Sequence, residues 1–178
     1  PSQIMENWCY EPEALALFAN HYQTGEMIPM ELVHKIKESA SFQEGIATMR
    51  QLSFGLLDMG WHAQDPSNIK DIKAFETEQF AATQLYPEVK ENAMSTSFSH
   101  IFQGGYSSGY YSYKWAEVLD ADAFEYFQEC GIFNKEVATK FKENVLSKGG
   151  TEHPMILYKR FRGQEPKPEA LLRRAGLL

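Results

Sequence analysis

Apolar residues recur at intervals of three and four along most of this sequence, and this spacing restricts the fold more than any other feature. Leu15 and Phe18 show it near the start, and Val137, Phe141 and Val145 show it again in the last third. Residues with this spacing lie on one face of an α-helix. No segment alternates apolar and polar residues for longer than about five positions, the ordinary length of a strand. The sequence therefore predicts an all-α protein.

The expected helices are bounded by residues that commonly start or end a helix. Ser41 and Asn134 are expected to be N-caps, because their side-chain oxygens can accept hydrogen bonds from the first free N–H groups. Gly131 lies where a helix C-cap is expected. A segment of mixed character runs from Tyr86 to Gly109. We expect a single α-helical region over residues 1–178, with helices near 11–22, 29–39, 41–59, 71–84, 110–129, 134–148, 154–162 and 168–174.

The charge balance argues against nucleic-acid binding. The chain has 24 Asp and Glu against 17 Lys and Arg, a formal charge of −7, and an acidic chain is a poor partner for a phosphate backbone. Residues 155–178 are the exception, because six basic and two acidic residues give this tail +4 and leave −11 on residues 1–154. We interpret the tail as a basic segment docked on an acidic body, and the alternative is a nucleic-acid arm.

Two further counts bear on the cellular setting. No apolar run reaches the roughly 18 residues that a membrane-spanning helix needs, so no membrane partner is expected. Cys9 and Cys130 form no Cys-x-x-Cys pair and no disulfide framework. Free thiols in a reducing compartment are therefore expected.

The histidines do not form a recognisable zinc motif. They lie at positions 21, 34, 62, 100 and 153, and no His-Glu-x-x-His occurs. A helical zinc site needs two imidazoles one turn apart. The sequence also has no Gly-x-Ser-x-Gly and no phosphate-binding Gly-Lys-Ser/Thr loop. We therefore predict no metal ligands within residues 1–178.

One segment, residues 98–115, has the composition of a binding site. Its glycines allow positive φ angles or a close approach of the backbone to a ligand. Its tyrosine hydroxyls can donate hydrogen bonds without carrying charge at neutral pH, and could bind a peptide backbone or an oxyanion. The alternative is an aromatic-rich helix start packed in a core, with a structural histidine beside it. The histidine, glycines and tyrosines of the segment are His100, Gly104, Gly105, Tyr106, Gly109, Tyr110, Tyr111 and Tyr113.

This segment also carries a resemblance. The run His-x-Phe-x-Gly-Gly-Tyr-x-x-Gly-Tyr-Tyr-x-Tyr-x-Trp-x-Glu-Val, residues 100–118, resembles the substrate-binding segment of the thimet oligopeptidase family of zinc metallopeptidases. Pro-Ser-Gln-x-x-Glu-Asn-Trp at residues 1–8 and Tyr-Lys-Arg-Phe-Arg-Gly at residues 158–163 resemble the same family. Residues 154–166 look closest to the bacterial peptidyl-dipeptidase (dipeptidyl carboxypeptidase) branch.

The resemblance implies a place within a larger enzyme. In this family a His-Glu-x-x-His motif and a later Glu bind zinc, and the later Glu lies two residues before Pro-Ser-Gln. All zinc ligands would then precede Pro1. The chain is expected to be the C-terminal part of the catalytic domain of a mostly helical, zincin-type, cytoplasmic peptidase. Its partners would be short peptides and the preceding part of the same protein, and alone it would bind no zinc and be inactive.

The resemblance also implies residue roles. Tyr113 would donate a hydrogen bond to the tetrahedral oxyanion, with assistance from His100. Tyr106 and Tyr110 would bind the peptide substrate. Gly104, Gly105 and Gly109 would let the loop move or lie close to the peptide.

A different class of function remains open from the sequence. The chain could be a stand-alone, non-catalytic helical module whose tyrosine-glycine segment binds a peptide. Such a module needs no upstream metal motif and should bind its ligand as isolated. Hydrolysis that depends on zinc ligands encoded before Pro1 would distinguish the enzyme from this module.

Overall fold

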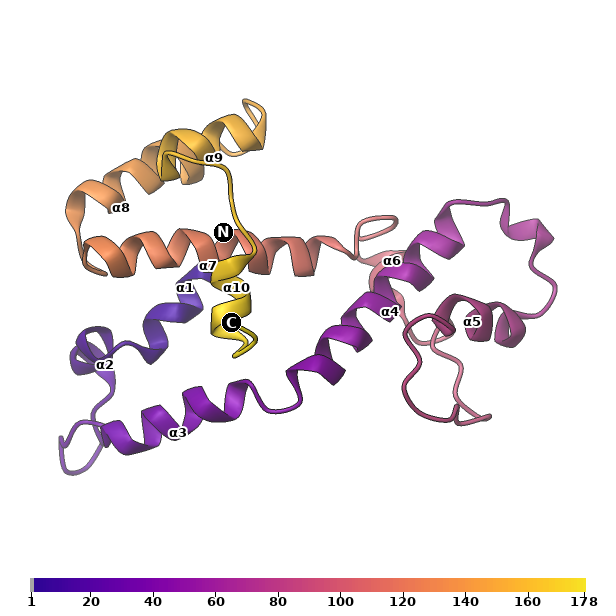
Figure 1. The fold of residues 1–178 in the computed structure, drawn as a ribbon, viewed down its shortest axis with the longest axis horizontal. Coiled ribbons are helices and arrows are strands. Elements are labelled where there is room, and N and C mark those ends of the chain that lie inside the picture. The colour runs from indigo at the N-terminus through magenta and orange to yellow at the C-terminus, as the bar shows by residue number, and fades with distance from the viewer. Residues whose placement is uncertain (1) are drawn as a thin grey trace. The chain divides into compact units, whose positions relative to one another are not determined.

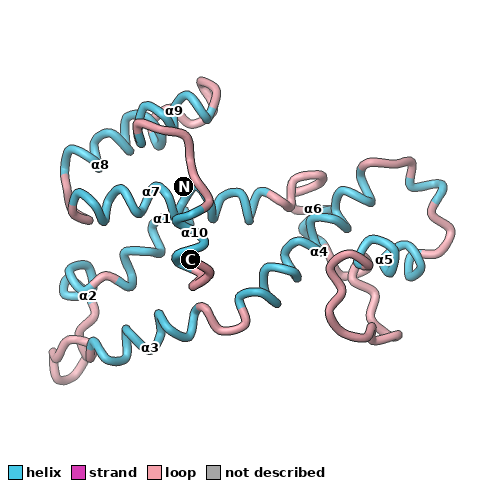
Figure 2. The backbone as a smooth tube through the Cα atoms, viewed as in Figure 1, coloured by secondary structure: helices cyan, strands magenta, loops and turns pink. Residues whose placement is uncertain are grey.

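The computed structural model describes residues 2–178, and this part of the chain is helical. Figure 2 shows helices joined by loops and turns. Among these residues no strand forms, and the β-type pairing present is an isolated bridge between Asn20 and Met27. The predicted all-α class is therefore confirmed. The α-helices are α1 (Ser2–Glu6), α2 (Pro12–Phe18), α3 (Met30–Ala40), α4 (Glu44–His62), α5 (Ile72–Phe80), α6 (Ser99–Gln103), α7 (Ser112–Cys130), α8 (Lys135–Phe141), α9 (Pro154–Arg162) and α10 (Glu169–Arg174).

Two of the expected caps are present and one is not. The side chain of Asn134 accepts hydrogen bonds from the N–H groups of Glu136 and Val137 at the start of α8. Gly131 follows α7 with a φ of 100°. The prediction for Ser41 was wrong, because its hydroxyl donates to the carbonyl of Glu38 at the end of α3. The long helix α4 begins at Glu44 instead.

The chain divides into two compact units, one of residues 2–42 and 116–178 (unit 1) and one of residues 43–115 (unit 2). Unit 1 is built around aromatic side chains from α7, α8 and α9. Figure 1 shows these three helices side by side. The ring of Phe141 lies 5.1 Å from that of Phe161 and 5.9 Å from that of Phe127. Trp8 adds an edge-to-face contact with Phe124, at 4.7 Å. Such ring pairs add packing energy to the area they bury.

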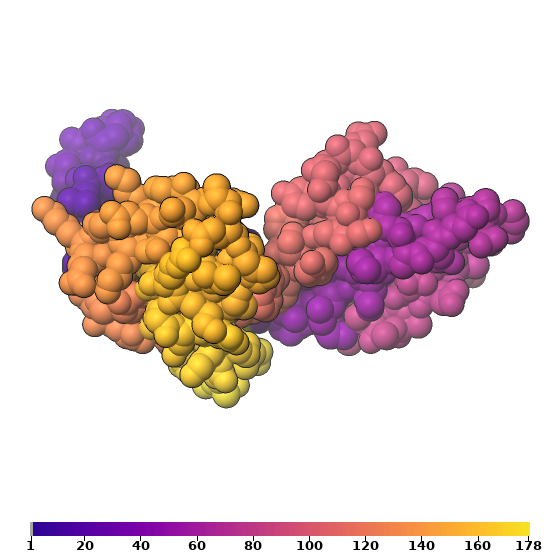
Figure 3. Space-filling model, turned by 90° about the horizontal axis from the view of Figure 1, so that it is seen from above, coloured from indigo at the N-terminus to yellow at the C-terminus, as the bar shows by residue number. Residues whose placement is uncertain are grey.

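The basic tail binds within unit 1, as predicted. Arg174 pairs with the carboxylate of Asp120, and Arg173 pairs with Glu125 at 2.5 Å. In Figure 3 the yellow C-terminal segment is seen at the surface of unit 1. The tail is therefore docked on acidic residues of α7.

Unit 2 has a smaller core, formed where α4, α5 and α6 meet. Leu57 of α4 and Ile101 of α6 are fully buried, and Phe54, Phe75 and Phe98 complete the cluster. Figure 1 shows α4 and α5 joined by a loop, with α6 beside α4. This core supports the segment that carries every site residue predicted from the sequence.

Cys9 and Cys130 were expected to be free thiols buried in the core. Both are free, but both are exposed, so the expected burial was wrong. Within residues 2–178, no helix is both long enough and apolar enough to cross a membrane.

Candidate functional site

Residues 98–113 are attached to unit 2 by buried apolar side chains. Phe98 precedes α6 and Ile101 lies within it, and both belong to the core cluster of the unit. His100 lies between them and is exposed. On such a short helix, the two apolar residues anchor the backbone and leave the imidazole at the surface.

The glycines of this segment differ in what the backbone requires of them. Gly105 has a φ of 77°, which L side chains rarely adopt. A Cβ on Gly104 would lie 3.0 Å from the carbonyl oxygen of His100. A Cβ on Gly109 would lie 3.5 Å from the carbonyl of Tyr106, which is an ordinary contact. Gly104 and Gly105 are thus demanded by the turn itself, whereas Gly109 is not.

The predicted histidine and three of the tyrosines come together. The ring of Tyr113 lies 5.1 Å from those of Tyr106 and Tyr110. The imidazole of His100 lies 6.3 Å from the rings of Tyr106 and Tyr110. The three tyrosines are half-buried, whereas Tyr111, between two of them in sequence, is exposed.

The hydroxyls of Tyr110 and Tyr113 stay protonated at neutral pH. The hydrogen bond with the Tyr106 side chain, followed by burial, raises the pKa of Tyr113 above its usual range. Burial also raises the pKa of Tyr110, against a smaller opposing effect of the Arg50 charge. Protonated phenols are neutral donors, so the cluster can donate hydrogen bonds to carbonyl oxygens.

Tyr110 is held more firmly than a surface residue. Its ring packs edge-on against Phe98, with ring centres 4.9 Å apart, and against Phe54 at 5.8 Å. We expected the long helix to begin near Tyr110, but α7 begins at Ser112. The N–H of Tyr110 is directed elsewhere, to a carboxylate in α4.

That carboxylate belongs to Asp58, which sequence reasoning missed. Asp58 is 0% exposed. It accepts hydrogen bonds from the N–H groups of Ser108, at 2.9 Å, and Tyr110, at 2.8 Å. A signal was available, because an Asp within the apolar sequence of α4 is buried only if it is paired.

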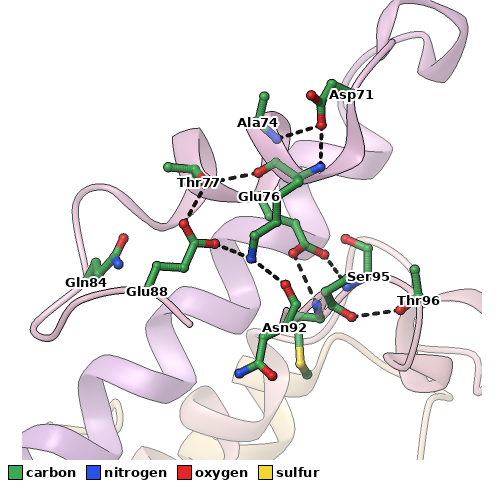
Figure 4. A network of polar contacts seen from close by, with 12 residues as sticks. Asp71, Ala74, Glu76, Thr77, Gln84, Glu88, Asn92, Ser95 and Thr96 are labelled. Atoms are coloured by element: carbon green, nitrogen blue, oxygen red, sulfur yellow. Dashed lines mark hydrogen bonds and ion pairs between the residues drawn. The ribbon is translucent and has the colours of Figure 1, made fainter. Parts of the chain in front are cut away.

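A second buried carboxylate, Glu76 of α5, holds the backbone that leads into the site. It is 1% exposed and accepts hydrogen bonds from the N–H groups of Met94, at 3.1 Å, and Ser95. Figure 4 shows Glu76 directed at Ser95. Nearby, Lys73 pairs with Glu88 and donates a hydrogen bond to the backbone carbonyl of Asn92. This network ties an irregular segment to α5.

The described residues do not fit a zinc site by themselves. In residues 2–178 no group of three or more His, Cys, Asp or Glu side chains lies in position to hold a metal ion. Unit 1 has a polar cavity of about 520 Å³ between α7 and the C-terminal segment. Its lining includes Glu125, Glu129, Arg162 and Arg173, which pair with one another, and none of the predicted site residues.

Comparison with known proteins decides the family. Residues 1–177 match the family described as Peptidase family M3. The chain belongs to this family. Among its relatives, oligopeptidase A of Escherichia coli (strain K12) is 48% identical over 99% of the chain, and the probable cytosolic oligopeptidase A of Arabidopsis thaliana is 43% identical over all of it.

The M3 relatives also correct the branch that we expected. The dipeptidyl carboxypeptidase of E. coli (strain K12) is 37% identical over 99% of the chain. Identity is thus higher to oligopeptidase A, although the tail residues favoured the other branch. The chain spans 26% of the length of each of these three relatives.

Proposed function

We propose that residues 98–113 bind the peptide substrate of a zinc-dependent M3 peptidase and donate hydrogen bonds to the reacting carbonyl. The observation that carries the proposal is the convergence of Tyr106, Tyr110 and Tyr113 beside His100. A raised pKa keeps the hydroxyls of Tyr110 and Tyr113 neutral. This arrangement occurs in a chain whose family is Peptidase family M3. The names oligopeptidase A and dipeptidyl carboxypeptidase among its relatives support short peptides as substrates.

The roles follow from the chemistry of amide hydrolysis. When water adds to a peptide carbonyl, the carbonyl oxygen gains negative charge, and a positioned donor stabilises it. In this proposal Tyr113 is that donor and His100 assists it. Tyr106 and Tyr110 bind the peptide, and Gly104, Gly105 and Gly109 let the loop lie close to it.

Zinc enters the proposal through the family of the chain and not through any ligand among its described residues. In M3 peptidases zinc supplies an activated water for the hydrolysis. The resemblance assigns the zinc ligands to residues before Pro1, which would be the partner of this chain in the working enzyme. The name of one plant relative supports a cytosolic location, although another relative is named organellar.

The test uses the complete gene product that contains residues 1–178. We expect Tyr113→Phe to lower kcat for a short peptide by about 100- to 1,000-fold, the usual cost of one oxyanion donor. KM should change little, because the oxyanion exists mainly in the transition state. Tyr111→Phe is the matched control, because Tyr111 is exposed and lies outside the ring contacts of the cluster. Its kcat should stay within about twofold of the unmodified enzyme. An unchanged kcat for Tyr113→Phe would contradict the assigned role.

A second measurement separates the enzyme from a binding module. We expect residues 1–178, expressed alone, to hydrolyse no peptide, with or without added zinc. The reason is that the described residues include no group of His, Cys, Asp or Glu side chains placed to hold a metal ion. Hydrolysis by these residues that a chelator abolishes would contradict the proposed division of the site. Tight peptide binding by a gene product without hydrolysis would favour the non-catalytic module.

A further inference from the structure

The carboxylate of Asp58 reaches across 50 residues of sequence to bind the backbone of the tyrosine-glycine segment. Its Oδ1 accepts the N–H of Ser108, and its Oδ2 accepts the N–H of Tyr110. The residue has no solvent contact. A buried carboxylate with both oxygens bonded is expensive to displace, so these two peptide groups are fixed to α4.

His62 holds the carboxylate itself in place. Its Nδ1 lies 2.9 Å from Oδ1 of Asp58 and 2.8 Å from the backbone carbonyl of Asp58. Both of these atoms are acceptors, so Nδ1 must carry the proton. The carboxylate of Asp58 therefore accepts three hydrogen bonds, one of them from its own helix, α4.

The effect of Asp58 reaches Tyr113 through one further hydrogen bond. The N–H of Tyr113 donates to the carbonyl of Tyr110 at 3.2 Å. The backbone of Tyr110 is thus fixed on one side by Asp58 and contacts the first turn of α7 on the other. The rings of these two tyrosines lie 5.1 Å apart.

We propose that Asp58 is a positioning residue for peptide hydrolysis: it acts through the backbone of Ser108 and Tyr110 to place the hydroxyls of Tyr110 and Tyr113. The inference rests on the proposed function of these tyrosines and adds to it a residue that touches no substrate. Displacing a catalytic group by about 1 Å can cost on the order of 100-fold in rate, so the effect of losing the anchor is measurable.

Glu76 provides the matched control. It is about as buried as Asp58 and also accepts hydrogen bonds from two backbone N–H groups, those of Met94 and Ser95. Its partners lie before Phe98, on the other side of the core anchor from the tyrosines. Removing its charge should therefore lower stability as Asp58→Asn does, without acting through Tyr113.

The experiment is a double-mutant cycle in the complete gene product, with Asp58→Asn, Glu76→Gln and Tyr113→Phe. Asn has the shape of Asp but replaces one acceptor with a donor, so one of the two backbone bonds is lost. We expect Asp58→Asn to lower kcat/KM about 10- to 100-fold alone, and less than about threefold in the Tyr113→Phe background. Glu76→Gln should change kcat/KM by the same factor in both backgrounds. An equal factor for Asp58→Asn in both backgrounds would overturn the proposal, because a structural defect alone is additive.

A second measurement needs no variant and guards against a variant that fails to fold. Hydrogen exchange with single-residue resolution should show the amides of Ser108 and Tyr110 exchanging at least about 100-fold more slowly than unprotected amides, since both are bonded to a buried carboxylate. Exchange at the unprotected rate would overturn the anchor.

The failures of the two proposals are distinguishable. If the unmodified gene product hydrolyses no peptide, the proposed function falls, and the positioning role falls with it. If hydrolysis depends on Tyr113 while Asp58→Asn leaves kcat/KM unchanged, the proposed function stands and only the positioning role is overturned.

Discussion

The two units of this chain partner their buried carboxylates with different groups. In unit 1, Asp122 accepts a hydrogen bond of 2.5 Å from the Tyr158 hydroxyl, and Asp120 pairs with Arg174. In unit 2, the carboxylate of Asp58 accepts hydrogen bonds from backbone N–H groups. Glu76 does the same in the segment before the site. The partners of the buried carboxylates are side chains in unit 1 and mainly backbone N–H groups in unit 2.

This difference matches what each unit has to hold. A side-chain pair such as Asp122 and Tyr158 joins one helix, α7, to another, α9. A carboxylate bonded to backbone N–H groups fixes a segment that has no repeating hydrogen-bond pattern of its own. Irregular segments are where binding residues commonly lie. The buried carboxylates of unit 1 thus join helices to one another, whereas those of unit 2 hold the irregular segment of the candidate site.

The largest expected effect concerns the two aromatic cores. Phe161 is buried among the rings of Tyr126, Phe127, Phe141 and Tyr158. We expect Phe161→Ala to lower the free energy of unfolding of unit 1 by about 3–5 kcal/mol, the usual cost of such a cavity. Hydrogen-exchange mass spectrometry on peptides of each unit would measure it. Equal loss of protection in unit 2 would contradict the view that each unit is stabilised by its own core.

The next effect tests the side-chain pairing in unit 1. Asp122→Asn weakens the acceptor for Tyr158 and removes the charge beside Arg162, whose Nε lies 3.5 Å from it. We expect a loss of about 2–3 kcal/mol, as for hydrogen bonds to a charged group. Thermal unfolding would measure this loss, and kcat/KM for peptide should stay within about threefold. A selective loss of kcat/KM without a change in stability would contradict the division between the units.

A smaller effect depends on pH. Burial, followed by the hydrogen bond to Asp122, raises the pKa of Tyr158 far above its usual value. The folded protein keeps this proton above about pH 10, where the unfolded chain loses it. The stabilising contribution is therefore complete below pH 10 and declines as the pH rises further. Tyr158→Phe should cost about 1 kcal/mol at pH 8, and the difference in melting temperature from wild type should shrink at pH 11. A constant difference would contradict the shift.

The smallest effect concerns the backbone of the site loop. Ser108 has a φ of 57°, which favours glycine. We expect Ser108→Gly to change the local stability by less than about 1 kcal/mol, with hydrogen exchange of the segment around Tyr110 as the measurement. Ser108→Val is the contrasting variant, because a β-branched side chain fits this conformation poorly, and protection should fall. Equal protection in both variants would show that Asp58 does not impose this conformation.

The sequence predicted most helices because their apolar spacing is a local property. The starts of α5 and α8 were found, and the expected helix near 154–162 is α9. The start of α4 was misplaced, because the Ser41 hydroxyl donates to the carbonyl of Glu38 at the end of α3 and does not cap α4, which begins at Glu44. The start of α7 was placed two residues early, because residues 107–111 form turns, which apolar spacing does not reveal.

The residues of the candidate site were found by composition and resemblance, but their support was not. His100, Tyr106, Tyr110 and Tyr113 are close in sequence, so a short motif was enough to place them together. Asp58 lies 50 positions away, and the spacing of residues in α4 does not reveal which partner its carboxylate meets. Such long-range contacts depend on tertiary packing, which apolar periodicity does not encode.

The anchor at Asp58 has a consequence for directed evolution. It binds the peptide nitrogens of residues 108 and 110 rather than their side chains. Proline, which lacks the N–H, is the substitution that removes such a bond outright. A library that diversifies the side chains around these positions would keep the course of the loop while changing the chemistry it presents. The same carboxylate that makes the loop rigid would thus leave its specificity open to change.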